Sequence, residues 1–172
     1  ARKTFRNEIY SDYKANRAEA PDDQAPQFEY IRKSVLAFNL PSVELVNYEA
    51  DDLIATYADM ILDKGAKVTI VSSDKDLMQL YKKNVRIFDP MKNKFISEED
   101  IQNKFGVDSS KVIDVQALAG DSSDNVPGVP GIGVKTAAEL INKYGNLDKL
   151  LKSAYEIKQN KRRETLIENK DK

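Results

Sequence analysis

The 172-residue sequence contains no histidine, no cysteine and no tryptophan. Because histidine and cysteine are missing, serine-histidine and cysteine-histidine catalytic sets, the usual zinc ligands and thiol or disulfide chemistry are excluded. No stretch approaches the roughly 20 apolar residues that cross a bilayer, and the first residues lack the apolar core of a signal peptide. We therefore expect an intracellular protein without a membrane partner, whose chemistry depends on carboxylates, lysine, arginine, tyrosine or hydroxyl groups.

Charge is nearly balanced, with 27 lysine and arginine residues against 28 aspartate and glutamate residues, but it is unevenly distributed. Residues 1–17 carry five basic and two acidic residues, residues 41–60 carry five acidic and no basic residues, and residues 141–172 carry nine basic and five acidic residues. Basic ends around an acidic middle favour a protein that binds a polyanion and holds cations at its centre. The alternative is that ordinary solvated helix faces produce each run of charge.

The alternation of apolar and polar residues predicts an α/β region in residues 1–96. Strands and helices that alternate at this spacing are typical of a parallel sheet. The expected strands span 42–46, 67–72 and 85–88, and the expected helices between them span 49–64 and 76–80. Within this region, three elements are expected before the first strand: a short helix, a mobile loop to about Gln27, and a helix from about Pro26 to Phe38.

After residue 96 the pattern indicates helices only. Ser97 is expected to cap a helix that ends at Gly106, and Ser110 to cap the next one. A further helix is predicted over residues 135–144, and the lysine-rich remainder to Lys172 is expected to be helical and frayed.

Seven acidic residues form three clusters at the ends of expected elements. They are Glu49, Asp51 and Asp52, then Asp74 and Asp76, then Asp121 and Asp124. Taken singly, such residues also cap a helix or complement its dipole. Taken together they favour a metal site, because the carboxyl ends of parallel strands meet at one edge and close carboxylates need a cation between them. Without histidine or cysteine the site favours Mg²⁺ or Mn²⁺, and two such ions suit phosphodiester cleavage.

A glycine- and proline-rich segment, VPGVPGIGVKT, spans residues 126–136. It is not the phosphate loop of an NTPase, because Val134 separates the last glycine from Lys135 and no expected strand precedes it. We interpret it as a hairpin between two helices, whose backbone N–H groups bind one nucleic-acid phosphate without reading the base sequence. An ordinary turn between packed helices is the alternative. The candidate phosphate-binding residues are Gly128, Gly131, Gly133 and Lys135.

The first segment offers a second place for a polyanion. Lys14 and Arg17 are three residues apart and reach the same side of a helical turn, and Tyr13 could stack on a base. A solvated helix end is the commoner explanation of such a pattern, so this interpretation depends on the other motifs.

Six motifs occur in order along the chain: KTFR at 3–6, YKANR at 13–17, EADD at 49–52, SDKDL at 73–77, GDSSDN at 120–125 and PGVPGIG at 127–133. In these motifs, and over nearly all of its length, the chain resembles the 5′→3′ exonuclease, or flap endonuclease, domain of bacterial DNA polymerase I. The resemblance implies a metal-dependent hydrolase that cleaves DNA or an RNA primer near a 5′ end, at flaps and nicks. The implied setting is DNA replication and repair in the bacterial cytoplasm, at the nucleoid, with a polymerase domain in the same polypeptide.

The resemblance also implies roles for the candidate residues. The seven acids match ligands of two Mg²⁺ ions, some direct and some through water, and Mn²⁺ would substitute. Lys14 and Arg17 match catalytic residues that hold the scissile phosphate, and Tyr13 matches a stacking position near the gateway for the 5′ strand. The remaining expected assignments are Arg6 to the DNA-binding set, residues 11–27 to a mobile arch, and residues 126–135 to a helix-hairpin-helix element that holds the duplex and binds K⁺.

The implied fold is a PIN-like 5′-nuclease core over residues 1–96, followed by a helical DNA-binding subdomain over residues 97–172. In the family, a strand with one metal-binding aspartate, and then a second aspartate, would precede Ala1, and further helices would follow Lys172. We therefore expect part of a longer polypeptide that cleaves weakly by itself. Two alternatives stay open at this point: a non-catalytic module that binds DNA junctions, and a related RNA-cleaving nuclease with the same core.

Overall fold

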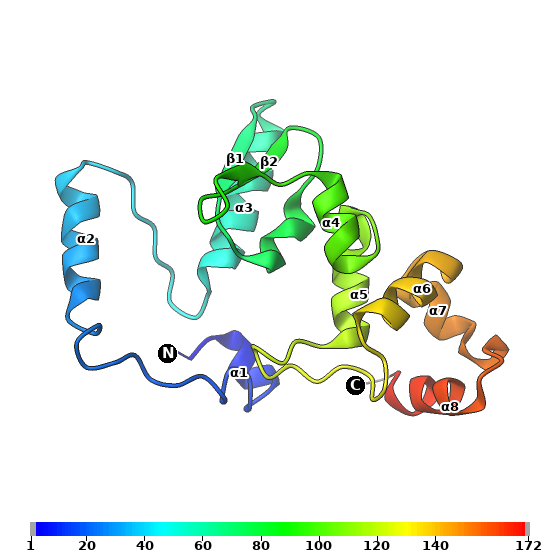
Figure 1. The fold of residues 1–172 in the computed structure, drawn as a ribbon. Coiled ribbons are helices and arrows are strands. Elements are labelled where there is room, and N and C mark those ends of the chain that lie inside the picture. Colours follow the sequence, from blue (N-terminus) through cyan, green and yellow to red (C-terminus); the bar gives the residue numbers. More distant parts are fainter. Residues whose placement is uncertain (1–2, 171–172) are drawn as a thin grey trace.

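The computed structural model describes residues 3–170, which form an α/β region, a helical region and an extended arm (Figure 1). The sheet has the strand order β1-β2-β3 and packs against helix α3 (Ala50–Asp63). Strands β1 (Val68–Val71) and β2 (Val85–Asp89) are parallel, with Val68 opposite Val85, and the short β3 (Lys94–Phe95) is antiparallel to β2. The expected α/β class is confirmed, as is the parallel arrangement of the second and third predicted strands.

The strand expected over residues 42–46 is wrong. These residues form an irregular connection, and the apolar side chains of Val43, Leu45 and Val46 are exposed. A strand needs a neighbour for its backbone groups, and within residues 3–170 the ladder of β1 is made with β2. Val43 instead lines a shallow apolar groove beside α3 and β1. The antiparallel β3 was not expected from the sequence, because its two residues are too few for a periodic pattern.

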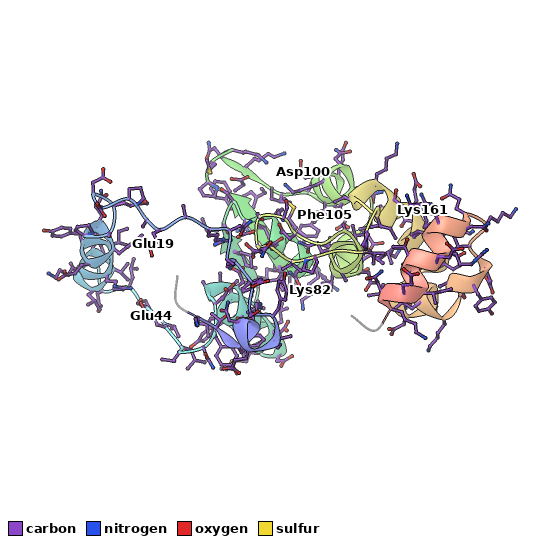
Figure 2. All side chains as sticks on the ribbon, turned by 90° about the horizontal axis from the view of Figure 1, so that it is seen from below. Glu19, Glu44, Lys82, Asp100, Phe105 and Lys161 are labelled. Carbon is purple, nitrogen blue, oxygen red and sulfur yellow. The ribbon has the colours of Figure 1, made fainter. Side chains whose placement is uncertain are left out.

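The segment before α3 forms an arm that stands away from the sheet (Figure 1). It contains α1 (Phe5–Ile9) and α2 (Gln27–Ala37), which confirms both helices expected there. The large apolar residues of α2, among them Tyr30, Ile31 and Leu36, are exposed. Figure 2 shows Glu19 and Glu44 on the two connections that lead to and from α2, on the opposite side of the molecule from Lys161.

Between the two parallel strands the chain forms a short 3-10 helix, η1 (Lys75–Leu80), where a short helix was expected. Asp74 caps it, because its Oδ1 accepts the backbone N–H of Asp76 at 2.9 Å. The loop after β1 is also fixed by Asp89 at the end of β2, whose Oδ1 accepts the hydroxyl of Ser73 at 2.6 Å and the backbone N–H of Met91 at 3.0 Å. The two strand ends are therefore tied together beside Asp74.

The helical region confirms the expected run of helices. It contains α4 (Glu98–Phe105), α5 (Val112–Ala119), α6 (Val134–Tyr144), α7 (Leu147–Lys152) and α8 (Asn160–Asn169), with two 3-10 turns, η2 (Ser109–Lys111) and η3 (Ala154–Glu156). Ser97 caps α4, and Gly106 ends it in the left-handed conformation with a φ of 73°. The cap expected at Ser110 is wrong, since Ser110 lies inside η2, which Asp108 caps by accepting the Ser110 N–H at 3.1 Å, and Lys111 is the N-cap of α5. The last two residues of the expected final helix lie outside the described residues.

One apolar core runs from the sheet through the helical region. Its most deeply buried members include residues of β2 and of each helix from α4 to α8: Ile87 of β2, Ile101 of α4, Val115 of α5, Ile141 of α6, Leu150 of α7 and Leu166 of α8. Burial of this kind is the main source of stability in a folded domain. None of the helices in the described part of the chain combines the length and apolar character needed to span a bilayer.

Candidate active site

A polar cleft of about 740 Å³ lies at the carboxyl end of β1. Its lining comes from the first segment, the start of α3, the loop after β1 and the turn that follows α5. Five of the seven predicted metal-binding acids line it: Glu49, Asp51, Asp74, Asp76 and Asp124. The predicted cationic pair Lys14 and Arg17, with Tyr13, lines the same cleft. Residues far apart in the sequence therefore meet here, as the strand-end argument predicts.

The start of α3 places Glu49 in the cleft and turns Asp52 away from it. Glu49 is the N-cap of α3, and Asp52 Oδ2 accepts the Glu49 backbone N–H at 2.8 Å. The same carboxylate receives two hydrogen bonds from Arg6, both 2.8 Å long, and this guanidinium lowers the pKa of Asp52. Asp52 and Arg6 thus pair with each other beside the cleft, and the metal and DNA roles expected for them stay predictions.

Lys14 bridges carboxylates from two sides of the cleft. Its Nζ lies 2.7 Å from Glu49 Oε2 and 3.5 Å from Asp124 Oδ2, and Arg17 also pairs with Asp124. Burial by itself would lower the pKa of Lys14, but its hydrogen bonds with Glu49 and Tyr13 raise it, so the ammonium stays charged. The two residues expected to hold a phosphate are therefore gathered at the acids.

The Tyr13 hydroxyl stands between the same two acids, 3.1 Å from Glu49 Oε2 and 3.2 Å from Asp124 Oδ2. Burial, with a smaller contribution from the charge of Glu49, raises the pKa of Tyr13 to about 12, so the phenol keeps its proton and donates it. Tyr13 therefore helps to connect α3 with the turn after α5.

Lys75 makes the equivalent bridge on the other side of the cleft, and sequence reasoning missed it. It pairs with Asp121, and its Nζ lies 3.4 Å from Asp76 Oδ1. Burial alone would raise the pKa of Asp121, but hydrogen bonds from Lys75 and Ser123 lower it to about 2. Gln116 of α5, also missed, donates to Asp76 Oδ1 at 2.6 Å. Lys75 could have been identified as a site residue from its position between two cluster acids in SDKDL. No pattern in the sequence pointed to Gln116.

Asp51 lies close to other carboxylates in the cleft. Its pKa is raised, first by burial and then by the charges of Asp74 and Glu49. Asp51 is partly buried and its ionised form is repelled by two neighbouring carboxylates. A cation placed between them would stabilise that ionised form. The electrostatics of the cleft therefore call for positive charge near Asp51.

The donor chemistry of the cleft fits a hard divalent cation. No three acidic residues between 3 and 170 form a group that could hold one ion in this conformation. Lys14 pairs with Glu49 and Asp124, and Lys75 pairs with Asp76 and Asp121. The available ligands are nevertheless all oxygen atoms, which Mg²⁺ and Mn²⁺ prefer. Thr4, 7% exposed, also lines the cleft, and its hydroxyl has no hydrogen-bond partner within the described chain.

The glycine-rich segment is a hairpin between α5 and α6, as predicted. Gly128 is required by packing, because a Cβ there would stand 2.3 Å from the backbone carbon of Ala119. Gly131 has a φ of 79°, and Gly133 is the N-cap of α6. Around both of these positions the described structure leaves open space, and Lys135 beside them is exposed. Gly131 and Gly133 are thus exposed at the start of α6, whereas Gly128 serves the contact with α5.

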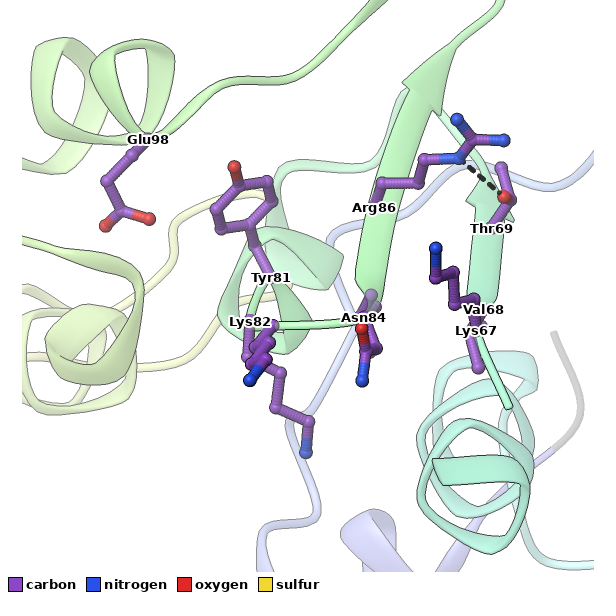
Figure 3. Close-up of a pocket in the computed structure, with 10 residues that line it drawn as sticks. Lys67, Val68, Thr69, Tyr81, Lys82, Asn84, Arg86 and Glu98 are labelled. Atoms are coloured by element: carbon purple, nitrogen blue, oxygen red, sulfur yellow. Dashed lines mark hydrogen bonds between the residues drawn. The ribbon is translucent and has the colours of Figure 1, made fainter. Parts of the chain in front are cut away.

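A second hollow, of about 660 Å³, lies at the opposite ends of β1 and β2 (Figure 3). Its lining is basic, with Lys67, Lys82 and Arg86, and Arg86 donates to the hydroxyl of Thr69 at 2.9 Å. Glu98, the acid in this lining, already accepts the Ser109 N–H at 2.7 Å. The hollow therefore lacks the group of free carboxylates that a divalent ion needs, and the candidate site is the cleft.

The fold and the cleft define a nuclease-type α/β domain, with acids at the strand ends and a helical module built around a hairpin. Comparison with family models identifies the family. Residues 1–106 match the 5′-3′ exonuclease N-terminal resolvase-like domain, and residues 107–172 match the 5′-3′ exonuclease C-terminal SAM fold. The chain belongs to the 5′-3′ exonuclease family, which confirms the resemblance found in its motifs.

Individual relatives agree with this assignment. The chain is 57% identical over 169 residues to DNA polymerase I of Rhizobium leguminosarum, a match that covers 98% of the chain and 17% of the polymerase. It is 44% identical over 151 residues to a 5′-3′ exonuclease of Aquifex aeolicus, covering 88% of the chain and 52% of that protein. The chain thus spans about a sixth and about half of the length of these two relatives.

Two similar solved structures come from bacteriophage T5. One is a flap endonuclease in a pseudo-enzyme-product complex with DNA and metal ions, 25% identical, with a TM-score of 0.82 over 96% of this chain and 65% of that one. The other is a 5′-exonuclease with bound zinc, 26% identical, with the same TM-score and the same shares of the two chains.

Proposed function

We propose that this chain hydrolyses phosphodiester bonds near the 5′ ends of DNA, at flaps, nicks and RNA primers, with the help of divalent metal ions. The observation that carries the proposal is the meeting of Lys14 and Arg17 with Glu49 and Asp124 in one cleft. Cations that bind phosphate and carboxylates that bind metal ions are the two parts that such a reaction requires. Family membership and the metal- and DNA-bound T5 relatives support the same assignment.

In this proposal the cluster acids bind two Mg²⁺ ions, for which Mn²⁺ substitutes. When bound, the ions generate a hydroxide and stabilise the leaving oxygen. Lys14 and Arg17, which pair with Glu49 and Asp124 here, would exchange these partners once the two acids held metal ions. The freed side chains then hold the scissile phosphate, which restores the pairing of each cation.

The other candidate residues would bind the nucleic acid around the cleft. Exposed backbone groups at Gly131 and Gly133, with Lys135, suit one phosphate of the duplex, and carbonyl groups of the same hairpin suit K⁺. Tyr13 would stack on a base near the 5′ strand, and residues 11–27 would form the mobile arch over it. Because phosphates supply the contacts, binding should ignore base sequence and weaken steeply with salt.

The parent protein is proposed to act in replication and repair in the bacterial cytoplasm, at the nucleoid. Support for a polymerase in the same polypeptide comes from the DNA polymerase I relatives, of which the chain matches only a part. A second candidate function is a non-catalytic module that binds DNA junctions. The observation in its favour is that Glu49, Asp121 and Asp124 each pair with a lysine, while no three acids between residues 3 and 170 group around one point.

One experiment separates these functions. The full-length protein and its Asp124→Asn variant are compared on a labelled 5′-flap substrate, with and without Mg²⁺, by single-turnover cleavage and by flap binding in Ca²⁺. We expect Asp124→Asn to lower the cleavage rate by about a hundredfold or more, the scale of losing one charge-stabilising group, while binding changes little. Asp63→Asn, an exposed acid at the end of α3, is the matched control.

Failure of the full-length protein to cut the flap in Mg²⁺ while it binds tightly would favour the junction-binding module. Equal cleavage by Asp124→Asn and the unchanged protein would contradict the role of this acid.

A further inference from the structure

The segment that carries Lys14 has an unusual backbone conformation. Lys14 has a φ of 57°, in the left-handed region that a residue with a side chain adopts only at a cost. Such a conformation persists when surrounding contacts impose it, and these positions gather at functional sites. One such contact is the Lys14 backbone N–H, which donates to the backbone oxygen of Asp124 at 2.8 Å. The main chains of Lys14 and Asp124 therefore meet directly.

Two asparagines complete this contact from opposite sides. Asn125 Nδ2 donates to the backbone oxygen of Asp12 at 2.7 Å, and Asn16 Nδ2 donates to the backbone oxygen of Ser122 at 2.8 Å. Residues 12–17 and the turn at 121–126 thus each donate one side-chain amide hydrogen bond to the main chain of the other. Asn125 is itself left-handed, with a φ of 56°, a conformation that asparagine tolerates better than most residues.

The turn that receives Lys14 rests on the packed part of the molecule. Asp121 and Val126 exchange two backbone hydrogen bonds, of 2.9 and 2.8 Å, that close the turn directly after α5. Helix α5 in turn buries Val115 and Leu118 in the core. By contrast, the chain that enters and leaves residues 12–17 is exposed on the arm side. The packed turn therefore supports the exposed segment. Asp124 of the turn binds the side chains of Lys14 and Arg17, and the two asparagines add bonds from a side chain to the main chain.

We propose that Asn16 and Asn125 are positioning residues, which hold Lys14 and Arg17 over the acids in the orientation needed for phosphate binding. This inference rests on the proposed function of the cleft. Each amide donates to a backbone oxygen, so both act through the main chain. Their loss lets Lys14 leave the left-handed conformation, so that its Nζ points at the reacting phosphate for a smaller share of the time. Misplacement of a catalytic group lowers the rate of the chemical step more than it lowers binding.

Asn125→Gly is the sharpest test, because glycine accepts the left-handed conformation without strain but lacks the amide donor. Asn93→Gly is the matched control, since Asn93 is also left-handed, with a φ of 50°, in the exposed turn between β2 and β3. Asn16→Ala removes the reciprocal bond and provides a second, independent variant. All are made in the full-length protein.

The measurements are single-turnover cleavage of a saturating 5′ flap in Mg²⁺, flap affinity in Ca²⁺, and hydrogen exchange of the segment containing the Lys14 amide. We expect Asn125→Gly and Asn16→Ala each to lower the cleavage rate by about tenfold while affinity changes by less than about twofold, since the loss lies in positioning. Exchange at residues 12–17 should accelerate without faster exchange in α5. Asn93→Gly should match the unchanged protein in all three.

Unchanged cleavage together with unchanged exchange in both Asn125→Gly and Asn16→Ala would overturn the positioning role. A loss that appears in affinity alone, or equally in Asn93→Gly, would overturn it as well. If the unchanged protein does not cleave at all, the proposed function fails, and the exchange measurement still decides whether the two asparagines hold residues 12–17.

Discussion

The helical region and the segment before α3 are held in place by different forces. In the helical region, side chains such as Ile101, Ile141 and Leu150 are fully buried in a shared core. In the segment over residues 3–49, most large apolar side chains are exposed, and contacts with the rest of the chain are largely polar. One region is therefore fixed by packing and the other by hydrogen bonds and ion pairs.

This difference matches what each region would have to do. Burial stabilises a fold by about 25 cal/mol per Å² of apolar surface and does not depend on exact partners. The packed helical region can therefore keep one structure while polar contacts around it change. A partly exposed ion pair contributes about 0–1 kcal/mol, so its partners can be exchanged at little cost. In the proposed function, Lys14 and Arg17 would exchange their carboxylate partners for a phosphate, whereas the turn that carries Asp124 would stay fixed to α5.

The largest expected effect comes from making the same substitution in both regions. Leu150 of α7 is 0% exposed, whereas Leu36 of α2 is 70% exposed. Leu150→Ala should lower the free energy of unfolding by about 2–5 kcal/mol, through lost transfer energy and the cavity left behind. Leu36→Ala should change it by no more than about 0.5 kcal/mol. Urea denaturation followed by circular dichroism measures both.

A loss above about 1 kcal/mol in Leu36→Ala would mean that α2 packs against other residues in solution, since exposed positions rarely cost so much. The contrast between the two regions would then fail for the arm.

An intermediate effect on the free energy of unfolding is expected where the hairpin packs against the end of α5. Gly128→Ala would place a Cβ within 2.4 Å of the Ala119 backbone oxygen and 2.5 Å of the Gly120 nitrogen. The end of α5 must shift to relieve this contact, at a cost of about 1–3 kcal/mol in the free energy of unfolding. Gly133→Ala, whose Cβ would enter open space at a φ of −90°, is the control and should have little effect. Equal stability of the two variants would show that the hairpin does not pack on α5 as described.

The sequence was informative wherever a local signal determined the structure. Helix α3, helix α4 with its Ser97 cap and Gly106 end, and the meeting of the acids with Lys14 and Arg17 were all predictable from spacing and motifs. The strand expected over residues 42–46 failed, because pairing depends on a neighbour that local pattern cannot supply. Asp108 was overlooked as a cap because Ser110 is an equally good candidate in the sequence.

Contacts inside the cleft were less predictable than its composition. The bridges made by Lys75 and Lys14 depend on which charges face each other across the fold, and no spacing rule gives that. The same holds for the bond from Gln116 to Asp76. Polar residues in a turn have many possible hydrogen-bond partners. The residue types therefore predict that a turn forms, but not which other segment the turn contacts.

The smallest expected effect tests whether polar contacts also matter within the packed region. Asp100 of α4 accepts hydrogen bonds from Lys94 at 2.6 Å and from the Ser97 N–H at 3.0 Å, and these lower its pKa from 3.8 to about 2. A carboxyl group with a lowered pKa stabilises the fold above its ordinary pKa, and this contribution disappears as the pH falls through the lowered value. The melting temperature of Asp100→Asn should therefore be slightly below that of the unchanged chain at about pH 5–7, and the difference should shrink towards about pH 2. Glu99→Gln removes one charge from the same helical turn and controls for net charge. A melting-temperature difference that grows as the pH falls would contradict the expected sign. A difference as large as that caused by Leu150→Ala would mean that α4 depends on its cap as much as the core depends on packing.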